Sequence, residues 1–215
     1  MKISSGLFLA IFSVLLCSCS VDRKVMPKRS FTASGHTAYV SDSDQESGPY
    51  DIFTFETAEI EDDFDYGGEV TYFPRDNVGF AITHTAGTHD FLSTSDNKLG
   101  EVDLHYTSVD AKVFGGWETK NPSGGMYGGL GIFHAKFDEE ATGVDDLDID
   151  SGVGFTMQFG VLQFIDPSRR VFADIGVRYN LMESEVEIED GGSRASADID
   201  MIEFFAPVVS VGVRF

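Results

Sequence analysis

Long apolar segments are absent from this sequence beyond its N-terminus. No run of 18 or more apolar residues follows that region, which excludes a membrane-spanning helix there. Apolar residues also do not recur at 3.6-residue spacing, so no helix of normal length is expected. Basic residues are few, with 15 Lys and Arg against 36 Asp and Glu and a formal net charge of -21. Because nucleic-acid binding depends on Lys and Arg, this balance excludes a nucleic-acid partner.

Cysteine is equally scarce, occurring only at positions 17 and 19. No cysteine is left to pair further along the chain, so a disulfide framework is excluded. The chain is nevertheless not a disordered polyanion, because 42% of its residues are hydrophobic and 13% are aromatic. A chain with this composition buries part of its apolar surface.

The first residues have the pattern of a secretory signal, with Lys2, an apolar stretch to Leu16 and then small residues. We expect residues 1–18 to be a signal peptide. The stretch "LCSC" resembles a bacterial lipobox, and this resemblance implies that Cys19 is lipidated and becomes the first mature residue. Cleavage after Ser20 without a lipid is the alternative. We interpret the polar residues 19–49 as a linker, and whether residues 31–40 add a strand stays open.

The rest of the chain consists of segments with period-2 alternation, separated by Gly, Pro, Asp and Asn. Short connections that carry basic residues alternate with longer, acidic ones. This order predicts an all-β fold in which residues 50–215 form one eight-stranded antiparallel up-and-down barrel, with the long loops at one rim. The expected strands are 50–60, 67–74, 78–90, 101–118, 126–138, 151–165, 170–189 and 198–215.

The residues between the apolar positions decide whether such a barrel is soluble or transmembrane. In "VFADIGVRYNL" the odd positions from Val171 to Leu181 are apolar, while most even positions are small or carry isolated charges. Small residues suit the crowded interior of a narrow barrel, so the apolar row faces lipid. From Glu183 the same odd positions become glutamates, and Glu203 precedes the apolar row of 205–215 in the same way. Each apolar stretch spans the roughly 9–11 residues that cross a bilayer.

The C-terminal "VVSVGVRF" resembles the assembly signal of bacterial outer-membrane barrels, with alternating Val209, Val211 and Val213 before the final Phe215. The segmentation is similar to that of small eight-stranded barrels of the OmpA/OmpX type. The resemblance implies a monomer in the outer membrane of a Gram-negative cell, contact with membrane lipid and lipopolysaccharide, and insertion by the barrel assembly machinery. Both termini are then expected in the periplasm.

Charged residues on the inward rows predict an interior network. Asp174, Arg178 and Arg214 fall on these rows by register, and Lys112 and Glu56 are expected there too. An unpaired buried charge is costly, so we interpret them as a structural salt-bridge network that fills the barrel. A narrow gated channel is the alternative.

Five histidines raise the question of catalysis, because some outer-membrane barrels are enzymes. His105 and Ser108 lie three residues apart and therefore point to opposite faces of a strand. The His-x-Ser-Asn pattern of lipid A deacylases is absent, and His84 continues a lipid-facing row. We therefore predict no enzymatic activity. A barrel enzyme that acts on lipid A is the alternative.

The stretch "DLDIDSG" opens like a calcium loop, with Asp146, Asp148 and Asp150 at alternate positions. Its Gly is one place late and the closing Glu is missing, so we interpret it as an acidic loop that runs into a strand. No cofactor is expected, and loosely bound Ca²⁺ or Mg²⁺ at the acidic loops is left open. The predicted function is a structural, envelope-integrity or adhesion role of a barrel with acidic surface loops.

Overall fold

The computed structural model describes residues 24–42, 58–60, 63–93, 98–116 and 123–215. These residues contain ten β-strands and no helix that is long and apolar enough to span a membrane. The strands are β1 (Ser30–Asp42), β2 (Ala58–Ile60), β3 (Asp63–Arg75), β4 (Val78–Ser93), β5 (Lys98–Gly116), β6 (Gly124–Ala141), β7 (Asp146–Ile149), β8 (Gly152–Phe164), β9 (Val171–Asp190) and β10 (Ser193–Arg214).

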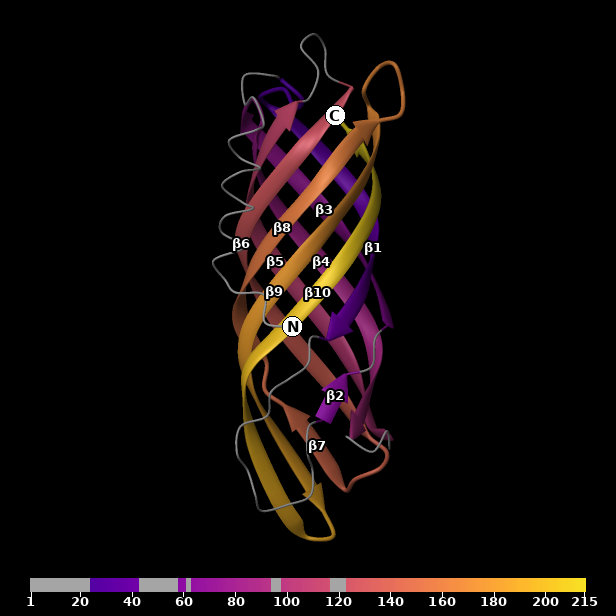
Figure 1. The fold of residues 1–215 in the computed structure, drawn as a ribbon, viewed down its shortest axis with the longest axis vertical. Helices are drawn as coiled ribbons and strands as arrows, with labels where there is room; N and C mark the ends of the chain where they lie inside the picture. Colours follow the sequence, from indigo (N-terminus) through magenta and orange to yellow (C-terminus); the bar gives the residue numbers. More distant parts are fainter. Residues whose placement is uncertain (1–23, 43–57, 61–62, 94–97, 117–122) are drawn as a thin grey trace.

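Eight of these strands form a closed antiparallel barrel, which confirms the predicted architecture (Figure 1). Neighbours pair in the order β1, β3, β4, β5, β6, β8, β9, β10, and β10 pairs back with β1 from Thr32↔Arg214 onward. The short strands β2 and β7 pair with β4 and β9 at one end. We call this end the loop end, and the opposite end, which carries Arg29, Asp76 and Phe215, the turn end.

The first barrel strand is not the one that we expected. β1 lies inside the segment that we interpreted as a linker, and it pairs with β10 on one side and β3 on the other. Residues 50–57 of the expected first strand lie outside the described residues, and 58–60 form the short β2. The question whether residues 31–40 add a strand is thereby answered. It stays open in the sequence because the outward positions of β1 include Gly35 and Thr37 and its inward ones Ser34 and His36, so apolar alternation is weak.

The acidic connection between the last two strands is much shorter than we expected. β9 and β10 continue until a two-residue turn at Gly191 and Gly192, whose φ angles are 59° and 77°. Positive φ at both central positions is what a tight hairpin turn requires, and glycine adopts it without steric cost. The hairpin extends beyond the rest of the loop end (Figure 1).

The outward row of the wall agrees with the predicted facing. Val209 and Val211 of β10 and Phe215, which follows the strand, are exposed, whereas Ser210 and Gly212 are buried. The same alternation places Phe155 of β8 and Ile175 of β9 outside, 70% and 67% exposed. The side chains of Glu183, Glu203 and Phe205 lie outside the described part, although Glu203 is paired with Leu181.

The interior is layered along the barrel axis. At the turn end a buried apolar cluster, the turn-end cluster, contains Val25, Met26, Phe73, Phe114, Tyr127, Leu162, Phe164 and Phe172. At the loop end a second one, the loop-end cluster, contains Ala38, Val40, Phe91, Leu99, Val102, Leu104, Tyr106, Phe133, Ala135, Phe137, Leu147, Ile149, Met182, Ala206 and Val208. Between them lies a polar belt made of Glu69, Asp110, Lys112, Gln158, Asp174 and Arg178, most of them buried.

Candidate functional site

The loop-end cluster arises because the apolar row changes face along the strands. On β5, Val109 is 52% exposed on the outer wall, whereas Leu104 and Tyr106 are buried inside. On β6, Ile132 faces outward and Phe133 faces inward. Beyond this point the outward positions are polar, and the inward ones build an apolar lumen in which Tyr106 packs edge-on against Phe133 at 6.3 Å. Because we expected small and polar interior positions throughout, this cluster was missed.

The polar belt is centred on a buried ion pair. Lys112 Nζ lies 2.5 Å from Glu69 Oε2, and the hydroxyl groups of Thr71 and Thr83 donate to the same carboxylate at 2.8 and 3.1 Å. The ammonium also lies 5.1 Å from the ring centroid of Tyr127. Lys112 is therefore inside, as predicted. Its partner Glu69 was not predicted, although its inward parity on β3 was the signal that could have identified it.

The other belt carboxylates accept hydrogen bonds from uncharged side chains. Tyr127 donates its hydroxyl proton to Asp174 at 2.9 Å, and Ser108 donates to Asp110 at 2.7 Å. Asp174 therefore lies inside, where its register placed it, but its described partner is a phenol and not an arginine. The structure shows a set of separate contacts where we expected one salt-bridge network.

Arg178 lies at the boundary between the belt and the loop-end cluster. Its guanidinium donates to Tyr106 Oη at 3.2 Å and sits 5.8 Å from the centroid of that ring. Among the described residues, no carboxylate lies within ion-pair distance of it, and Nε has no hydrogen-bond partner. Arg214 does not join Arg178, because it lies at the turn end over the Phe164 ring, 5.0 Å from its centroid.

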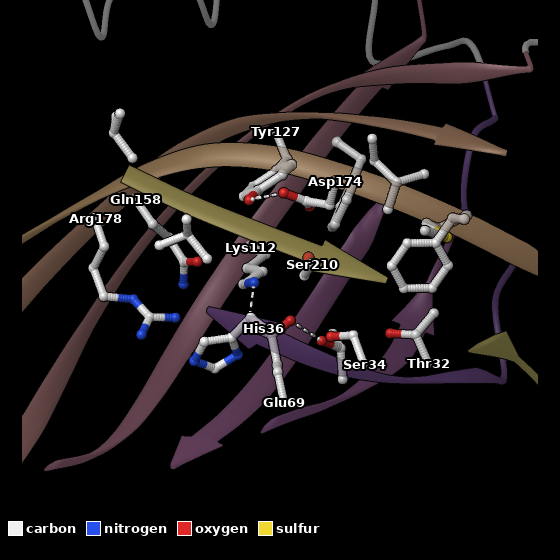
Figure 2. A pocket seen from close by; sticks show the side chains of 17 residues that line it. Thr32, Ser34, His36, Glu69, Lys112, Tyr127, Gln158, Asp174, Arg178 and Ser210 are labelled. Atoms are coloured by element: carbon white, nitrogen blue, oxygen red, sulfur yellow. Dashed lines mark hydrogen bonds and ion pairs between the residues drawn. The ribbon is translucent and has the colours of Figure 1, made fainter. Parts of the chain in front are cut away.

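A cavity of about 30 Å³ opens within the belt (Figure 2). By volume it holds about two water molecules. Arg178 and Gln158 come from neighbouring strands, are paired in register, and both line the cavity. Gln158 Nε2 has no partner among the described residues, so each of these two buried side chains has an N–H group available to a ligand or to water.

The turn end is closed by the chain that precedes β1. Asn77 Oδ1 accepts from the backbone N–H groups of Val25 and Met26 at 2.8 and 3.0 Å, and Asn77 N donates to Met26 O at 2.9 Å. We call residues 24–28 the strap. A hydrogen bond from Lys24 and another from the Lys28 backbone lower the pKa of the exposed Asp76 carboxyl. The strap lies in the segment that we expected to be a linker.

The histidines are divided between the two faces of the wall. His105 points outward and Ser108 inward, as predicted, so they do not form a dyad. His84 is exposed beside the lipid-facing row, and its Nδ1 shares a hydrogen bond with Thr107 Oγ1 at 2.9 Å. His89 lies inside, 2.9 Å from Asp65, and both side chains have 0% exposure.

The three aspartates of the calcium-like stretch do not surround a loop. Asp146 and Asp148 are exposed on β7, whereas Leu147 and Ile149 between them are buried, as the predicted strand requires. Register places Asp146 opposite Glu189 and Asp148 opposite Glu187. Among the described residues, no three His, Cys, Asp or Glu side chains converge as metal ligands.

Glu139 of β6 ties β7 to the wall by accepting a hydrogen bond from Ile149 N at 3.0 Å. Burial raises the pKa of its carboxyl, and the nearby Asp148 and Asp138 add to this effect.

The predicted lipidation at Cys19, the cleavage after Ser20 and the interior position of Glu56 lie outside the described residues. They stay predictions.

Comparison with solved structures agrees with this fold. The outer-membrane protein OprG from Pseudomonas aeruginosa is 19% identical over 88% of this chain and 97% of its own, with a TM-score of 0.74. AlkL, solved in lipid bilayers, is 17% identical over 90% and 93%, with a TM-score of 0.64. Outer Membrane Protein W of E. coli is 16% identical over 89% and 100%, with a TM-score of 0.57. No curated protein matches the chain.

The OmpW family pattern matches residues 31–215, and its first matched residue is the second residue of β1. The predicted similarity to small eight-stranded outer-membrane barrels is confirmed, and the OmpA/OmpX type is a near relative of the family that matches. The outer-membrane location is confirmed as well. This chain is an outer-membrane β-barrel that belongs to the OmpW family.

Proposed function

We propose that this protein binds small apolar molecules in the loop-end half of its lumen, with the loop end facing the cell exterior. The observation that carries the proposal is the loop-end cluster, an apolar lining inside the wall that continues from the polar belt to β7. A barrel that served only as a wall could fill this space with polar side chains, as the belt does. An apolar lining stabilises an apolar guest by removing its surface from water.

Entry into the loop-end cluster requires its cover to move. Leu147 and Ile149 of β7 bury their side chains in the cluster, but β7 is four residues long and pairs with β9 alone among the described strands. A short strand of this kind is less costly to displace than the long strands of the wall. We therefore assign the entrance to β7 and to the chain on either side of it.

Binding without catalysis fits the positions of the candidate catalytic groups. The buried dyad of His89 and Asp65 has no exposed atoms, and His105 and Ser108 lie on opposite sides of the wall. The belt, in turn, leaves a cavity for about two waters rather than an open pore, which supports a barrel that does not conduct ions. Lipid A mass spectrometry and planar-bilayer recording are expected to show no hydrolysis and no steady current.

The test uses the full chain in lipid nanodiscs and deuterated n-octane as the probe. Nuclear magnetic resonance of the Leu and Met methyl groups is expected to show saturable shifts at Leu104 and Met182, which both lie in the loop-end cluster. Leu104→Gln places a polar group in this lining and should abolish the shifts, whereas Leu162→Gln at the turn end should leave them. Shifts that never saturate, or that persist in Leu104→Gln, would show that octane only dissolves in the lipid.

A surface role is the second candidate, and the β9–β10 hairpin favours it. The hairpin projects beyond the loop end and carries Glu185, Glu187 and Glu189 on one row (Figure 1). A projecting acidic arm can contact other surfaces, such as cationic groups or metal-bridged lipopolysaccharide, and so act in adhesion or envelope integrity. Replacing residues 186–197 by Asn-Gly would remove the arm. The candidate fails if this variant leaves cell adhesion and detergent sensitivity as they are in the parent.

A further inference from the structure

The polar belt contains a cation that no carboxylate of the described residues pairs directly. Arg178 is 3% exposed, and its one described hydrogen bond goes to the phenol of Tyr106. The belt carboxylates have other donors: Lys112 for Glu69, Tyr127 for Asp174 and Ser108 for Asp110. We propose that Arg178 and Gln158 bind the carboxylate head of a single-chain amphiphile whose tail lies in the loop-end cluster. This inference rests on the proposed function and names its ligand class.

The donor geometry suits two carboxylate oxygens. Arg178 Nε and Gln158 Nε2 are both buried and unpartnered among the described residues, and both side chains line the same cavity. They sit opposite each other on β9 and β8 (Figure 2). A buried donor without a partner loses its hydration and gains nothing in return. A carboxylate that accepts from both groups removes this cost and adds two charge-assisted hydrogen bonds.

A glycine on the neighbouring strand makes room for these side chains. Gly129 of β6 is paired with Gln158 on one side and Lys112 on the other. A Cβ at this position would lie 2.9 Å from Gln158 Cγ and 3.2 Å from Lys112 Cγ. Any larger residue would displace Gln158 from its place against the cavity, so the position of the Gln158 side chain depends on this glycine.

The head site borders the loop-end cluster at two points, because Val208 of that cluster lines the cavity and Arg178 bonds to Tyr106. The other buried apolar side chains of the cavity wall belong to the turn-end cluster: Met26, Phe114, Tyr127, Leu162 and Phe172. The Tyr106 hydroxyl accepts a hydrogen bond from Arg178, and its ring lies beside the guanidinium. Tyr106 also belongs to the loop-end cluster and packs on Phe133. An alkyl tail that leaves Arg178 therefore runs along Tyr106 and Phe133 toward Leu104. The cavity of about 30 Å³ accepts a carboxylate and is far too small for a sugar or a phosphorylated head group.

Two negative groups of the chain limit the affinity. Glu69 and Asp110 both act electrostatically on Arg178, although neither is bonded to it. Glu69 is neutralised by Lys112, but Asp110 keeps an oxygen without a partner among the described residues. Asp110→Asn removes this charge without changing the shape of the side chain. It should therefore strengthen the binding of a carboxylate and leave that of an alkane unchanged.

The experiment compares n-octanoate with n-octane on the full chain in zwitterionic nanodiscs, with empty nanodiscs as the blank. Gln158→Glu supplies an internal carboxylate to Arg178, and it should weaken octanoate binding by about tenfold or more while octane binding stays the same. Arg178→Met should do the same. Lys136→Met removes a cation from the outer wall and should change neither ligand. Heat-modifiable gel mobility confirms folding, and Gln158→Glu carries the test if Arg178→Met does not fold.

The possible results separate the two proposals. If octane binds but both variants keep the parent's octanoate affinity, the head site is wrong and the apolar binding function stands. If octane does not bind and octanoate binding is still lost in Gln158→Glu, the apolar function is wrong and the head site stands. Octanoate that binds no better than octane to the parent also overturns the head site.

Discussion

The two ends of the lumen are both apolar, but they are closed in different ways. The turn-end cluster is sealed by the strap, whose backbone N–H groups are held by the Asn77 side chain. The loop-end cluster is covered by β7, which pairs with β9 along its four residues and at both flanks, where Asp145 N donates to Glu189 O and Asp150 N to Glu185 O. Glu139 of β6 adds one hydrogen bond from Ile149 N. At the turn end, the strap is hydrogen-bonded to Asn77 in the tight turn between β3 and β4. At the loop end, the cover is a short strand in which two of the four residues are aspartates.

This difference indicates that the turn-end cluster stabilises the barrel, whereas the loop-end cluster can admit and release a ligand. A seal bonded to a tight turn inside the barrel opens only when the barrel itself unfolds, whereas a four-residue strand that pairs with one described strand at the rim can separate locally. The polar belt between them keeps the two events independent, because side chains fill a narrow barrel and pass no apolar molecule through. Five predictions test this contrast.

The largest effect is expected from emptying the turn-end cluster. Phe73 has 0% exposure and packs edge-on against Phe114 at 5.4 Å, so Phe73→Ala should lower the free energy of unfolding by about 3–5 kcal/mol. Phe133→Ala at the loop end is the matched variant. It should lower the free energy of unfolding by only about 2 kcal/mol, because β7 can move into the cavity that the missing ring leaves. Urea unfolding in lipid vesicles measures both. Equal losses would remove the distinction between the two ends.

The outer wall gives the next effect. Val211 is 58% exposed on the lipid-facing row, so Val211→Arg places a charge in hydrocarbon at a cost of about 2–4 kcal/mol. Val211→Leu is the control and should unfold at the parent's urea concentration. If the arginine variant assembles and resists heat like the parent, the row of β10 that contains Val211 does not face lipid.

The strap can be released at one residue. Asn77→Gly removes the acceptor for Val25 and Met26 and leaves their N–H groups unpaired, at a cost of about 1–3 kcal/mol. Glycine tolerates the φ of 60° at this position, so the change adds no backbone strain. Asn77→Asp keeps the acceptor oxygen and is the control. Protease cleavage near Lys24 should speed up in the glycine variant alone, and cleavage at the parent's rate would contradict the role of the strap.

Divalent cations should act at the loop end and spare the turn end. The like-charged pairs Asp146↔Glu189 and Asp148↔Glu187 destabilise β7 by about 0.2–1 kcal/mol each. Mg²⁺ or Ca²⁺ should relieve this repulsion and slow hydrogen exchange in β7, and EDTA should reverse the effect. Glu187→Gln together with Glu189→Gln should remove the dependence. Identical exchange with and without EDTA would rule out cation binding here.

The smallest effect concerns acid and the strap. The pKa of Asp76 is lowered by its hydrogen bonds with Lys24 and Lys28, so the carboxylate form is favoured when the strap is bound. This contribution is complete above the ordinary pKa of an aspartate and is lost as the pH falls through the lowered value. Asp76→Asn should flatten the pH dependence of strap proteolysis. A parent strap that is cleaved equally fast at neutral and strongly acid pH would contradict this assignment.

Much of the wall could be predicted from the sequence, because lipid on one side and a crowded interior on the other impose strict alternation. On β9 and β10 the apolar row faces outward wherever the side chains are described, and Asp174 and Arg178 lie inside as their parity requires. β1 could not be recognised in this way, since Gly35, Thr37 and His36 show little contrast between the faces. Its place became clear only through its partners β10 and β3.

The candidate site was harder to predict, although a signal for it exists. On β5 the apolar row moves from Val109 on the outside to Tyr106 and Leu104 on the inside. The apolar residues thus change from the outer to the inner face where the strand leaves the lipid. The glutamates after Leu181 mark the same level on β9 in the sequence analysis. Lys112 pairs with Glu69, whereas Arg178 has no carboxylate partner in the part of the chain that the structure describes. Both facts depend on distances between strands that alternation does not specify.

The seam between β1 and β10 joins the two ends of the folded chain. Phe31 and Phe215 exchange backbone hydrogen bonds, with Phe31 N to Phe215 O at 3.3 Å and Phe215 N to Phe31 O at 2.9 Å. The barrel therefore cannot close until β1 and β10, which lie far apart in the sequence, have paired. Until then the chain has two open sheet edges, which are prone to pair with other molecules. Closing the barrel therefore depends on a contact with a large loop-closure cost, which is expected to form slowly.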